Sequence, residues 1–214
     1  FPTFRLRHAV TQRRSLLRYA ARRIPGSAQP SGCRFERIPV LISGAMRMTI
    51  HLPPGFHIRL AQPGDGALLL DVMLRCWTGT VAANASAYRE TAESITHQLE
   101  RGGGAIVFEG EAPVGGGRFY PVPGPAGDPC EWVEIKRVGI LKSHRKTGLG
   151  APLVEVLERE ARARGFAGAQ LGVRHDQSRL VAFWASLGYQ LADDVTLRTV
   201  NPLTPTPTFM RKRF

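Results

Sequence analysis

The pattern of apolar and polar positions divides the C-terminal three quarters of the chain into short strands and helices. Alternation between apolar and polar residues, and short apolar runs bounded by turn residues, predict strands over residues 56–60, 105–108, 114–122, 131–140, 169–173, 189–197 and 208–213. Apolar residues at helical spacing predict helices from Asp65 to Trp77, over 85–100 and 149–164, and from Asp176 or Ser178 to Leu187. The resulting order, β-α-α-β-β-β-α-β-α-β-β, indicates a mixed α/β domain built on one central sheet.

Composition and charge separate this domain from an arginine-rich leader. The 214 residues are 43% hydrophobic and 21% charged, which is typical of a globular protein and excludes a wholly disordered chain. Of the formal net charge of +12, residues 1–47 carry +9, from ten arginines and one glutamate, whereas residues 48–210 have no net charge. We therefore expect a disordered or non-native leader over residues 1–47 and a folded domain over residues 48–214.

Three interpretations of the leader stay open. An unstructured or non-native extension that precedes a start at Met46 or Met48 is the one we favour. The Ser, Arg and Ala content also resembles an organellar transit peptide, and ten arginines are suited to nucleic-acid phosphates. Because the domain itself has no net charge, a nucleic-acid partner is expected only if the leader is native.

The lengths of the apolar runs and the positions of the cysteines indicate in which cellular compartment the protein is expected. No apolar run approaches the roughly 18 residues that a membrane span needs, so we expect no membrane partner. The three cysteines are far apart and odd in number, which fits neither a disulfide framework nor a zinc site. The histidines have no metal-ligand spacing either. We expect a cytoplasmic protein without a metal, with organellar targeting by the leader as the alternative.

Residues 134–153 carry the clearest chemical signal. A strand ends near Ile140, and a short loop brings the sequence Arg-Lys-Thr-Gly-Leu-Gly, residues 145–150, to the start of a long helix. Such a turn directs backbone N–H groups and the positive end of a helix toward one point, which suits a pyrophosphate. Gly148 and Gly150 leave room for the anion, and the Arg and Lys of the loop add positive charge. The spacing matches neither a Walker loop nor a dinucleotide-binding loop.

This segment resembles the acetyl-CoA signature of the GNAT superfamily of N-acetyltransferases, in which a strand of the type E-I-x-x-V-x-V precedes R/Q-x-x-G-x-G/A. The residues in the matching positions are Glu134, Ile135, Val138, Ile140, Arg145, Gly148 and Gly150. Residues 183–189, Phe-Trp-Ala-Ser-Leu-Gly-Tyr, resemble the family's F-Y-x-x-x-G-F segment, and the order of elements matches over residues 56–214. The resemblance implies a GNAT fold: one central, mostly antiparallel sheet that splays open at the cofactor site, flanked by about four helices.

The resemblance also implies which residues hold acetyl-CoA, the expected cosubstrate. The backbone of Val138–Ile140 would pair with the pantetheine arm, and the amides of Lys146–Ala151 would hold the pyrophosphate. Gln177 stands where the family often has Asn, and it could hydrogen-bond the pantetheine arm. The cofactor-binding residues expected on these grounds are Val138, Ile140, Arg145, Lys146, Thr147, Gly148, Leu149, Gly150, Ala151 and Gln177.

Glu134 is the expected catalytic residue. An amine is mostly protonated at neutral pH, so a base must take its proton before it attacks the thioester. Glu134 matches the position of a general-base carboxylate in some members of the family. If it pairs with Lys136 or Arg118 instead, its role is structural.

Trp184 departs from the family pattern, because many members have a tyrosine there that protonates the departing thiolate. An indole N–H is no acid in water, so the proton would come from water, Tyr189 or His175. The helical spacing of four apolar residues predicts that they form a stripe in the core: Leu180, Phe183, Trp184 and Leu187.

These observations predict an N-acetyltransferase that moves an acetyl group from acetyl-CoA to a primary amine by direct attack in a ternary complex. A small-molecule amine, such as an amino acid, a polyamine or an aminoglycoside-like compound, is favoured over a protein. A protein Nα- or lysine acetyltransferase and a non-catalytic acyl-CoA-binding domain are the alternatives, and a homodimer is left open. Glu90 and Glu93, expected on the second helix, either attract a cationic substrate or lie on a solvated face, which we favour.

Overall fold

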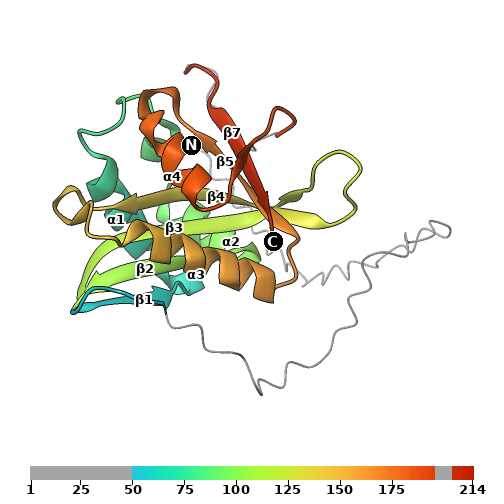
Figure 1. The fold of residues 1–214 in the computed structure, drawn as a ribbon. Coiled ribbons are helices and arrows are strands. Elements are labelled where there is room, and N and C mark those ends of the chain that lie inside the picture. The colour runs from blue at the N-terminus through green and yellow to red at the C-terminus, as the bar shows by residue number, and fades with distance from the viewer. Residues whose placement is uncertain (1–49, 196–203) are drawn as a thin grey trace, which may run out of the picture. The chain divides into compact units, whose positions relative to one another are not determined.

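The computed structural model of the protein describes residues 50–195 and 204–214, through which a seven-stranded sheet runs (Figure 1). In their order across the sheet, the strands are β1 (Phe56–Leu60), β2 (Gly103–Glu109), β3 (Ala112–Pro123), β4 (Glu131–Ile140), β5 (Gly168–Val173), β7 (Thr208–Arg213) and β6 (Gln190–Leu191). Neighbouring strands are antiparallel except β4 and β5, which are parallel. The mixed α/β fold with a mostly antiparallel sheet is therefore confirmed. The leader, its boundary at residue 48 and residues 196–203 lie outside the described residues.

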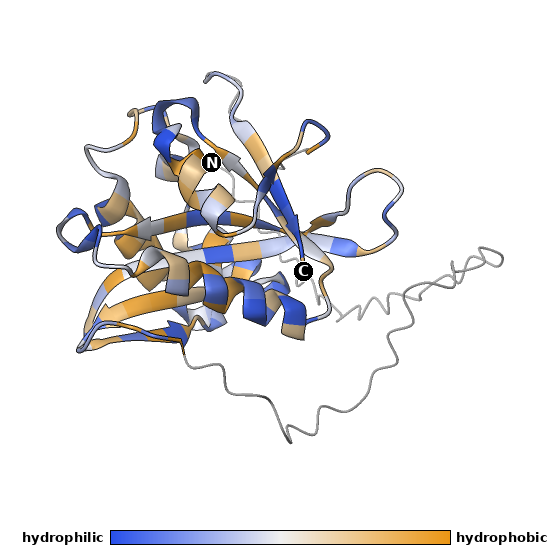
Figure 2. Ribbon diagram, in the orientation of Figure 1, coloured by the Kyte–Doolittle hydropathy of each residue, from blue (hydrophilic) through white to orange (hydrophobic). Residues whose placement is uncertain are grey.

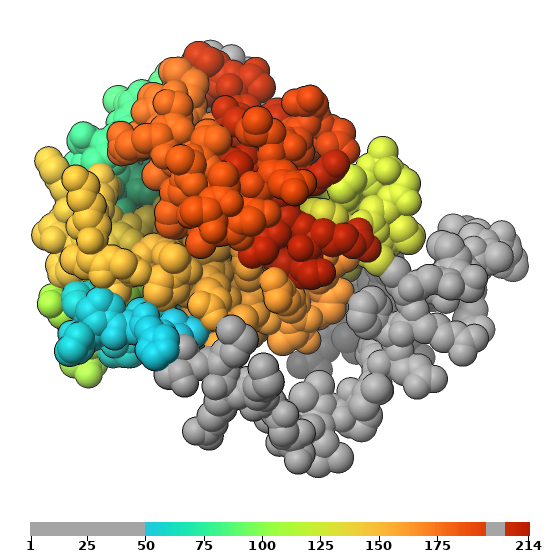
Figure 3. Space-filling view, in the orientation of Figure 1, coloured from blue at the N-terminus to red at the C-terminus, as the bar shows by residue number. Residues whose placement is uncertain are grey.

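Four helices flank the sheet in the described part of the chain. The helices are α1 (Gly66–Trp77), α2 (Ala92–Arg101), α3 (Gly150–Ala163) and α4 (Arg179–Ser186). In Figure 1, α3 crosses in front of β2 and β3, whereas α1 and α2 lie behind the sheet. On the face that Figure 3 shows, α3 lies between β1 and α4. This arrangement leaves the C-terminal end of β4 between α1 and the start of α3.

The core forms where the predicted apolar stripe of α3 meets the sheet. Leu149, Leu153, Leu157 and Ala161 recur once per turn and are all buried. They pack with the apolar residues of β2, β4 and β5, and Figure 2 shows the apolar colour along β2. Gly165 and Gly188, both at φ 88°, follow α3 and α4 where the sequence predicts that these helices stop.

The predicted helix over residues 85–100 is divided in two. A 3-10 turn covers Ser86–Arg89, and α2 begins only after Thr91. Thr91 and Ser94 cap α2 reciprocally, since each side-chain oxygen accepts a hydrogen bond from the other's backbone N–H, at 3.2 and 3.1 Å. The division places Glu90 in the link between the turn and the helix, so the expectation that it lies on the second helix is wrong.

Two smaller expectations also fail. Asp65 does not cap α1 with its side chain, because its carboxylate accepts the backbone N–H of Gln62 at 2.7 Å and pairs with Arg59. Leu180, predicted in the core stripe of the last helix, is 37% exposed, whereas Trp184 is buried as expected. At Asp65, local contacts with Gln62 and Arg59 outweigh the capping pattern of the sequence.

Candidate active site

The sheet opens between β4 and β5. These parallel neighbours pair only at Val133 with Ala169 and at Glu134 with Gln170. Beyond Glu134, β4 continues on β3 as far as Ile140, and β5 continues on β7. Along β4 the residues change from buried to half-exposed from position 137 onward. An extended ligand can therefore lie beside the last residues of β4 in the position of an added strand.

A β-bulge lies in β4 next to this opening. Gly116 pairs with Gly139 and Arg118 pairs with Lys136, so Gly117 faces two residues of β4, one of which is Arg137. Arg137 has a φ of 57°, which is unusual for a residue other than glycine. The extra residue interrupts the alternation of the strand, and two consecutive side chains, those of Lys136 and Arg137, contact the same carboxylate, that of Glu90.

The loop between β4 and α3 contains two residues with positive φ and leads into a helix whose first turn has no side-chain cap. Lys146 and Gly148 have φ values of 67° and 87°, and α3 begins at Gly150 without a side-chain cap. A Cβ added at Gly148 would meet nothing within 4 Å, and one at Gly150 would only touch the Phe183 ring, at 3.4 Å. Because no packing demand explains Gly150, the small residues fit a group that approaches the first amides of the helix.

Arg145 makes two hydrogen bonds to backbone carbonyls within the protein. Its Nε donates to the carbonyl of Ile140 at 3.1 Å, and its Nη2 donates to the carbonyl of Cys76 at 2.7 Å. The guanidinium thus ties the loop to the end of β4 and to the last turn of α1. The side chain thereby holds the loop in place, and the expectation that its charge also serves a phosphate stays a prediction.

The other expected cofactor residues occupy two regions. Val138 and Ile140 are half-exposed in the part of β4 that lies beyond its pairing with β5, and Lys146 and Thr147 are exposed in the loop. Leu149 is buried in the core, so only its backbone can take part in binding. Ala151 is half-buried in the first turn of α3.

Gln177 lies after β5 and is engaged at both ends of its side-chain amide. Its Nε2 donates to the carbonyl of Thr80 at 3.0 Å, and its Oε1 accepts from Arg179 at 2.8 Å. It thereby connects the segment after β5 with the loop after α1.

Glu134 lies at the point where β4 and β5 separate. Its side chain is buried, and its Oε2 accepts a hydrogen bond from the Tyr120 hydroxyl at 2.8 Å. Tyr120 stands directly opposite Glu134 in the register of β3 and β4. The ammonium of Lys136, the next residue on the same face, lies 5.1 Å from the centre of the Tyr120 ring. Of the two structural partners considered for Glu134, Arg118 forms its ion pair with Glu90.

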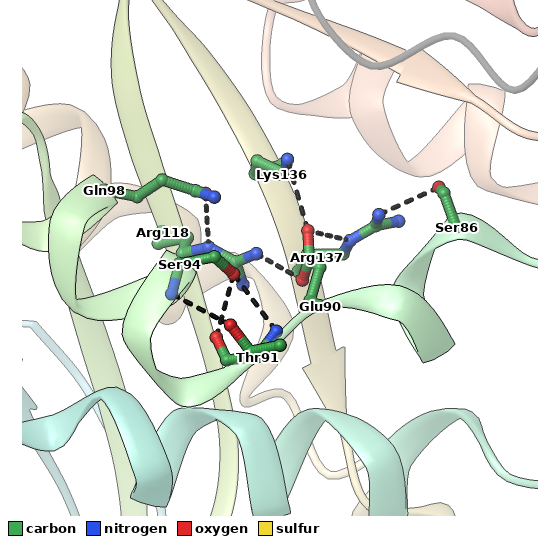
Figure 4. A network of polar contacts seen from close by, with 8 residues as sticks. All are labelled: Ser86, Glu90, Thr91, Ser94, Gln98, Arg118, Lys136 and Arg137. Atoms are coloured by element: carbon green, nitrogen blue, oxygen red, sulfur yellow. Dashed lines mark hydrogen bonds and ion pairs between the residues drawn. The ribbon is translucent and has the colours of Figure 1, made fainter. Parts of the chain in front are cut away.

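Glu90 is the centre of a network that sequence reasoning missed (Figure 4). Its carboxylate pairs with Arg118, with Lys136 at 3.3 Å and with Arg137 at 3.2 Å. Arg118 also donates to Gln98 at 2.9 Å. The interpretation of Glu90 as part of a solvated face is therefore wrong. A sequence signal did exist, because two consecutive cations interrupt an otherwise alternating strand.

The charges of this network shift each other's pKa values. Burial raises the pKa of Glu90, but Arg118, Arg137 and Lys136 together outweigh it and hold that pKa below its ordinary value. Burial is the largest influence on Arg118 and Lys136, and it lowers the pKa of each despite the nearby Glu90. Glu93, by contrast, is exposed on α2, as expected for a solvated face.

Trp184 and the candidate proton donors Tyr189 and His175 have different surroundings. Trp184 packs edge-to-face against Phe183 and Tyr189, with ring centres 5.4 and 5.2 Å apart. Burial, and then the Glu158 carboxylate, raise the pKa of Tyr189 far above its ordinary value. Tyr189 is therefore a poor acid, whereas His175 is exposed.

Within residues 50–195 and 204–214, no group of three or more His, Cys, Asp or Glu side chains is placed to hold a metal ion. Over the same ranges, the helices are too short or too polar to cross a membrane. Burial raises the pKa of the free thiol of Cys76 to about 11.

Comparisons with known proteins agree with this geometry. The profile described as "Acetyltransferase (GNAT) family" matches residues 68–189. The chain is 32% identical over 89 residues to an uncharacterized N-acetyltransferase, YjcF, of Bacillus subtilis, covering 42% of this chain and 56% of that protein. It is 33% identical over 87 residues to the uncharacterized protein YyaT of the same organism, covering 41% and 52%. The chain thus matches about half the length of these curated relatives.

Solved structures show the same fold. An acetyltransferase from Streptococcus agalactiae has a TM-score of 0.60 and 19% identity, covering 75% of this chain and 99% of that one. The PaiA N-acetyltransferase of Thermoplasma acidophilum, in complex with coenzyme A, has a TM-score of 0.58 and 14% identity, covering 74% and 99%. YncA, a putative acetyltransferase from Salmonella typhimurium with its cofactor acetyl-CoA, has a TM-score of 0.57 and 20% identity, covering 74% and 94%. Since the family profile spans more than half of the chain and the fold agrees, the protein belongs to the GNAT acetyltransferase family.

Proposed function

We propose that the protein is an N-acetyltransferase that moves the acetyl group of acetyl-CoA to a primary amine of a small molecule. The observation that carries this proposal is the separation of β4 from β5 directly beyond Glu134. An unpaired edge of β4, the loop proposed to bind an anion and a buried carboxylate all lie next to this opening. Two structural neighbours, PaiA in complex with coenzyme A and YncA with acetyl-CoA, add support.

In this proposal acetyl-CoA is bound mainly through backbone groups of the protein. The peptide groups of Val138–Ile140 pair with the pantetheine arm, and the amides of Lys146–Ala151 receive the pyrophosphate at the positive end of α3. Arg145 and Gln177 are proposed to hold the neighbouring loops in place, because their side chains join the loops on either side of the opening. The ammonium of Lys146, which is exposed in the same loop, is proposed to attract a phosphate.

Glu134 is proposed to accept the proton of the acceptor's ammonium group. The neutral amine nitrogen then attacks the acetyl carbonyl carbon, so that a C–N bond forms and the C–S bond breaks. A backbone N–H near Ile140 stabilises the negative charge that develops on the carbonyl oxygen. The thiolate of coenzyme A leaves and takes a proton from water or His175, while the nitrogen gives up its second proton to solvent water as the amide forms. The acetyl group passes directly between the two substrates, without an intermediate on the protein.

The experiment combines binding and turnover on the purified protein. At acetyl-CoA 100-fold above its Kd, the free energy of unfolding rises by about 2.7 kcal/mol, which raises Tm by several degrees. Free thiol is then released in the presence of an accepted amine. Glu134→Gln should lower kcat by about 100-fold or more and leave the acetyl-CoA-dependent rise in Tm unchanged.

Glu93→Gln, on an exposed face of α2, is the matched control and should behave as wild type. A folded protein that acetyl-CoA does not stabilise would contradict the proposal. Stabilisation without turnover of any small amine or amino-terminal peptide would favour a non-catalytic acyl-CoA-binding domain, in keeping with Trp184 at the tyrosine position. Turnover of peptides alone would favour a protein acetyltransferase.

A further inference from the structure

The network around Glu90 shares one face of the sheet with the proposed catalytic base. Glu134 and Lys136 are two residues apart on β4, and their cross-strand partners are Tyr120 and Arg118 on β3. Residues at this spacing point to the same side of a strand, and their Cα atoms lie about 7 Å apart. The cations of the network are therefore within reach of a small molecule whose amino group lies at Glu134.

Positive charge exceeds negative charge on this face. Arg118, Lys136 and Arg137 carry three positive charges, against the two carboxylates of Glu90 and Glu134. The side chains are withdrawn from solvent: Arg118 is 1% exposed and Lys136 is 7% exposed. Buried charge is costly unless an opposite charge compensates it. The lowered pKa values of Arg118 and Lys136 agree, because burial outweighs the attraction of Glu90.

The backbone is strained at the place where this charge is gathered. Arg137 adopts a φ of 57° within the bulge of β4, and its side chain contacts Glu90 and Ser86 and lies over the ring of Trp77. Strain of this kind persists where the surrounding structure enforces it and is frequent at functional sites. Here it adds a second cation, next to Lys136, on the Glu90 side of the strand.

Resting on the proposed function, we propose that Arg118, Lys136 and Arg137 bind a carboxylate of the acceptor, so that the acceptor is an amine of the amino-acid type. The acceptor's carboxylate takes the place of the Glu90 carboxylate among the three cations while its ammonium lies at Glu134. The cavity that Arg118 and Arg137 line beneath α1 holds about 10 Å³, room for about one water, so exchange with Glu90 is required.

The same charge count disfavours acceptors that are cationic only. A polyamine or an aminoglycoside would bring several positive charges to a face that already carries an excess of one, and would bring no anion to offset them. Of the small-molecule classes that the sequence leaves open, the network therefore selects the amino-acid class.

The test compares acceptors that differ only in the carboxylate. Phenylalanine is paired with phenethylamine, leucine with isopentylamine, and methionine with 3-(methylthio)propylamine, and spermidine and kanamycin represent the cationic classes. We expect kcat/KM for the accepted amino acid to exceed that of its decarboxylated partner by at least about tenfold, and the cationic compounds to be poor acceptors.

Two variants change the charge of the network in opposite directions. Glu90→Gln removes one negative charge and a competing carboxylate, so KM for the amino acid should fall by about tenfold. Arg137→Gln removes one positive charge, so KM should rise by about tenfold. The decarboxylated amine should show no such change, or the opposite one. A purely structural role would move both members of a pair alike, and the Tm of each variant reports whether it folds.

Failure of the inference can be told apart from failure of the proposed function. Acetyl-CoA-dependent stabilisation and thiol release report on the proposed function. If both are absent, the rise in Tm that each amino acid or amine produces still reports on the anion site. The inference is overturned if the decarboxylated amines or cationic compounds are preferred, if both variants shift the paired compounds alike, or if no amino acid of the panel binds or reacts.

Discussion

Arg145 offers a sharp test of how the loop before α3 is built. The family resemblance implies that its charge serves the phosphates of the ligand, whereas in the structure its guanidinium is bonded to the carbonyls of Ile140 and Cys76. Replacing it in Arg145→Met removes two hydrogen bonds from a charged donor and keeps the apolar stem. The two interpretations predict losses in different quantities, namely stability and ligand affinity.

The size of the stability loss follows from these two bonds. A hydrogen bond from a charged donor contributes about 1.5–3 kcal/mol when it is buried, and less at a half-buried site such as this one. We therefore expect Arg145→Met to lower the free energy of unfolding by about 2–3 kcal/mol. For a domain of this size, the corresponding fall in Tm is about 4–12 °C.

The assay measures Tm by circular dichroism and acetyl-CoA affinity by calorimetry, at a temperature where each variant is folded. Lys146→Met is the matched control, since Lys146 is the adjacent, exposed cation of the same loop. It should keep the wild-type Tm and bind acetyl-CoA several-fold more weakly, in a salt-dependent way. An Arg145→Met protein with wild-type Tm and strongly reduced affinity would refute the structural role of Arg145.

Three further predictions concern the loop, the network and the core. Gly150→Glu should fold normally but bind acetyl-CoA at least 100-fold more weakly, because a carboxylate within about 5 Å of a phosphate costs about 3 kcal/mol at an effective dielectric constant of 20. Gly150→Gln is the neutral control, and equal affinities of the two variants for acetyl-CoA would count against the pyrophosphate site. Because the pKa of Glu90 lies below its ordinary 4.5, the stability it contributes is present above about pH 4.5 and is lost as the pH falls through the lowered pKa. Urea unfolding between pH 3 and 7 should show a weaker acid dependence in Glu90→Gln, and an identical profile would be inconsistent with the paired carboxylate. Leu157→Ala, at a fully buried position, should lower the free energy of unfolding by about 2–5 kcal/mol, and a loss below 1 kcal/mol would contradict the packing of α3.

The local pattern of apolar and polar residues predicted most of the helices and strands. The strands over residues 56–60 and 131–140 have the predicted bounds, because alternation and flanking turn residues leave few other arrangements. The α3 stripe was equally clear, with Leu153 and Leu157 fully buried. The family resemblance supplied the mostly antiparallel sheet, but the order of strands across it was not predicted, since apolar periodicity alone does not say which strands become neighbours.

The features that sequence reasoning missed depend on contacts between distant residues. The bulge at Arg137 exists only in the pairing of β3 with β4, and Glu90 meets Arg118 across 28 positions of the chain. The division of the second helix had a local signal, since Thr91 and Ser94 form a cap. For the candidate site, sequence thus located the loop and Glu134 but not the charged network beside them.

The most direct test of the account is the initial rate of thiol release as a function of both substrate concentrations. Direct attack of an amine on acetyl-CoA requires both substrates to be bound together, so double-reciprocal plots at several fixed amine concentrations should intersect. Parallel lines would indicate an acetylated form of the protein, and they would contradict direct transfer. Thiol release that does not depend on any amine would contradict the proposed function itself.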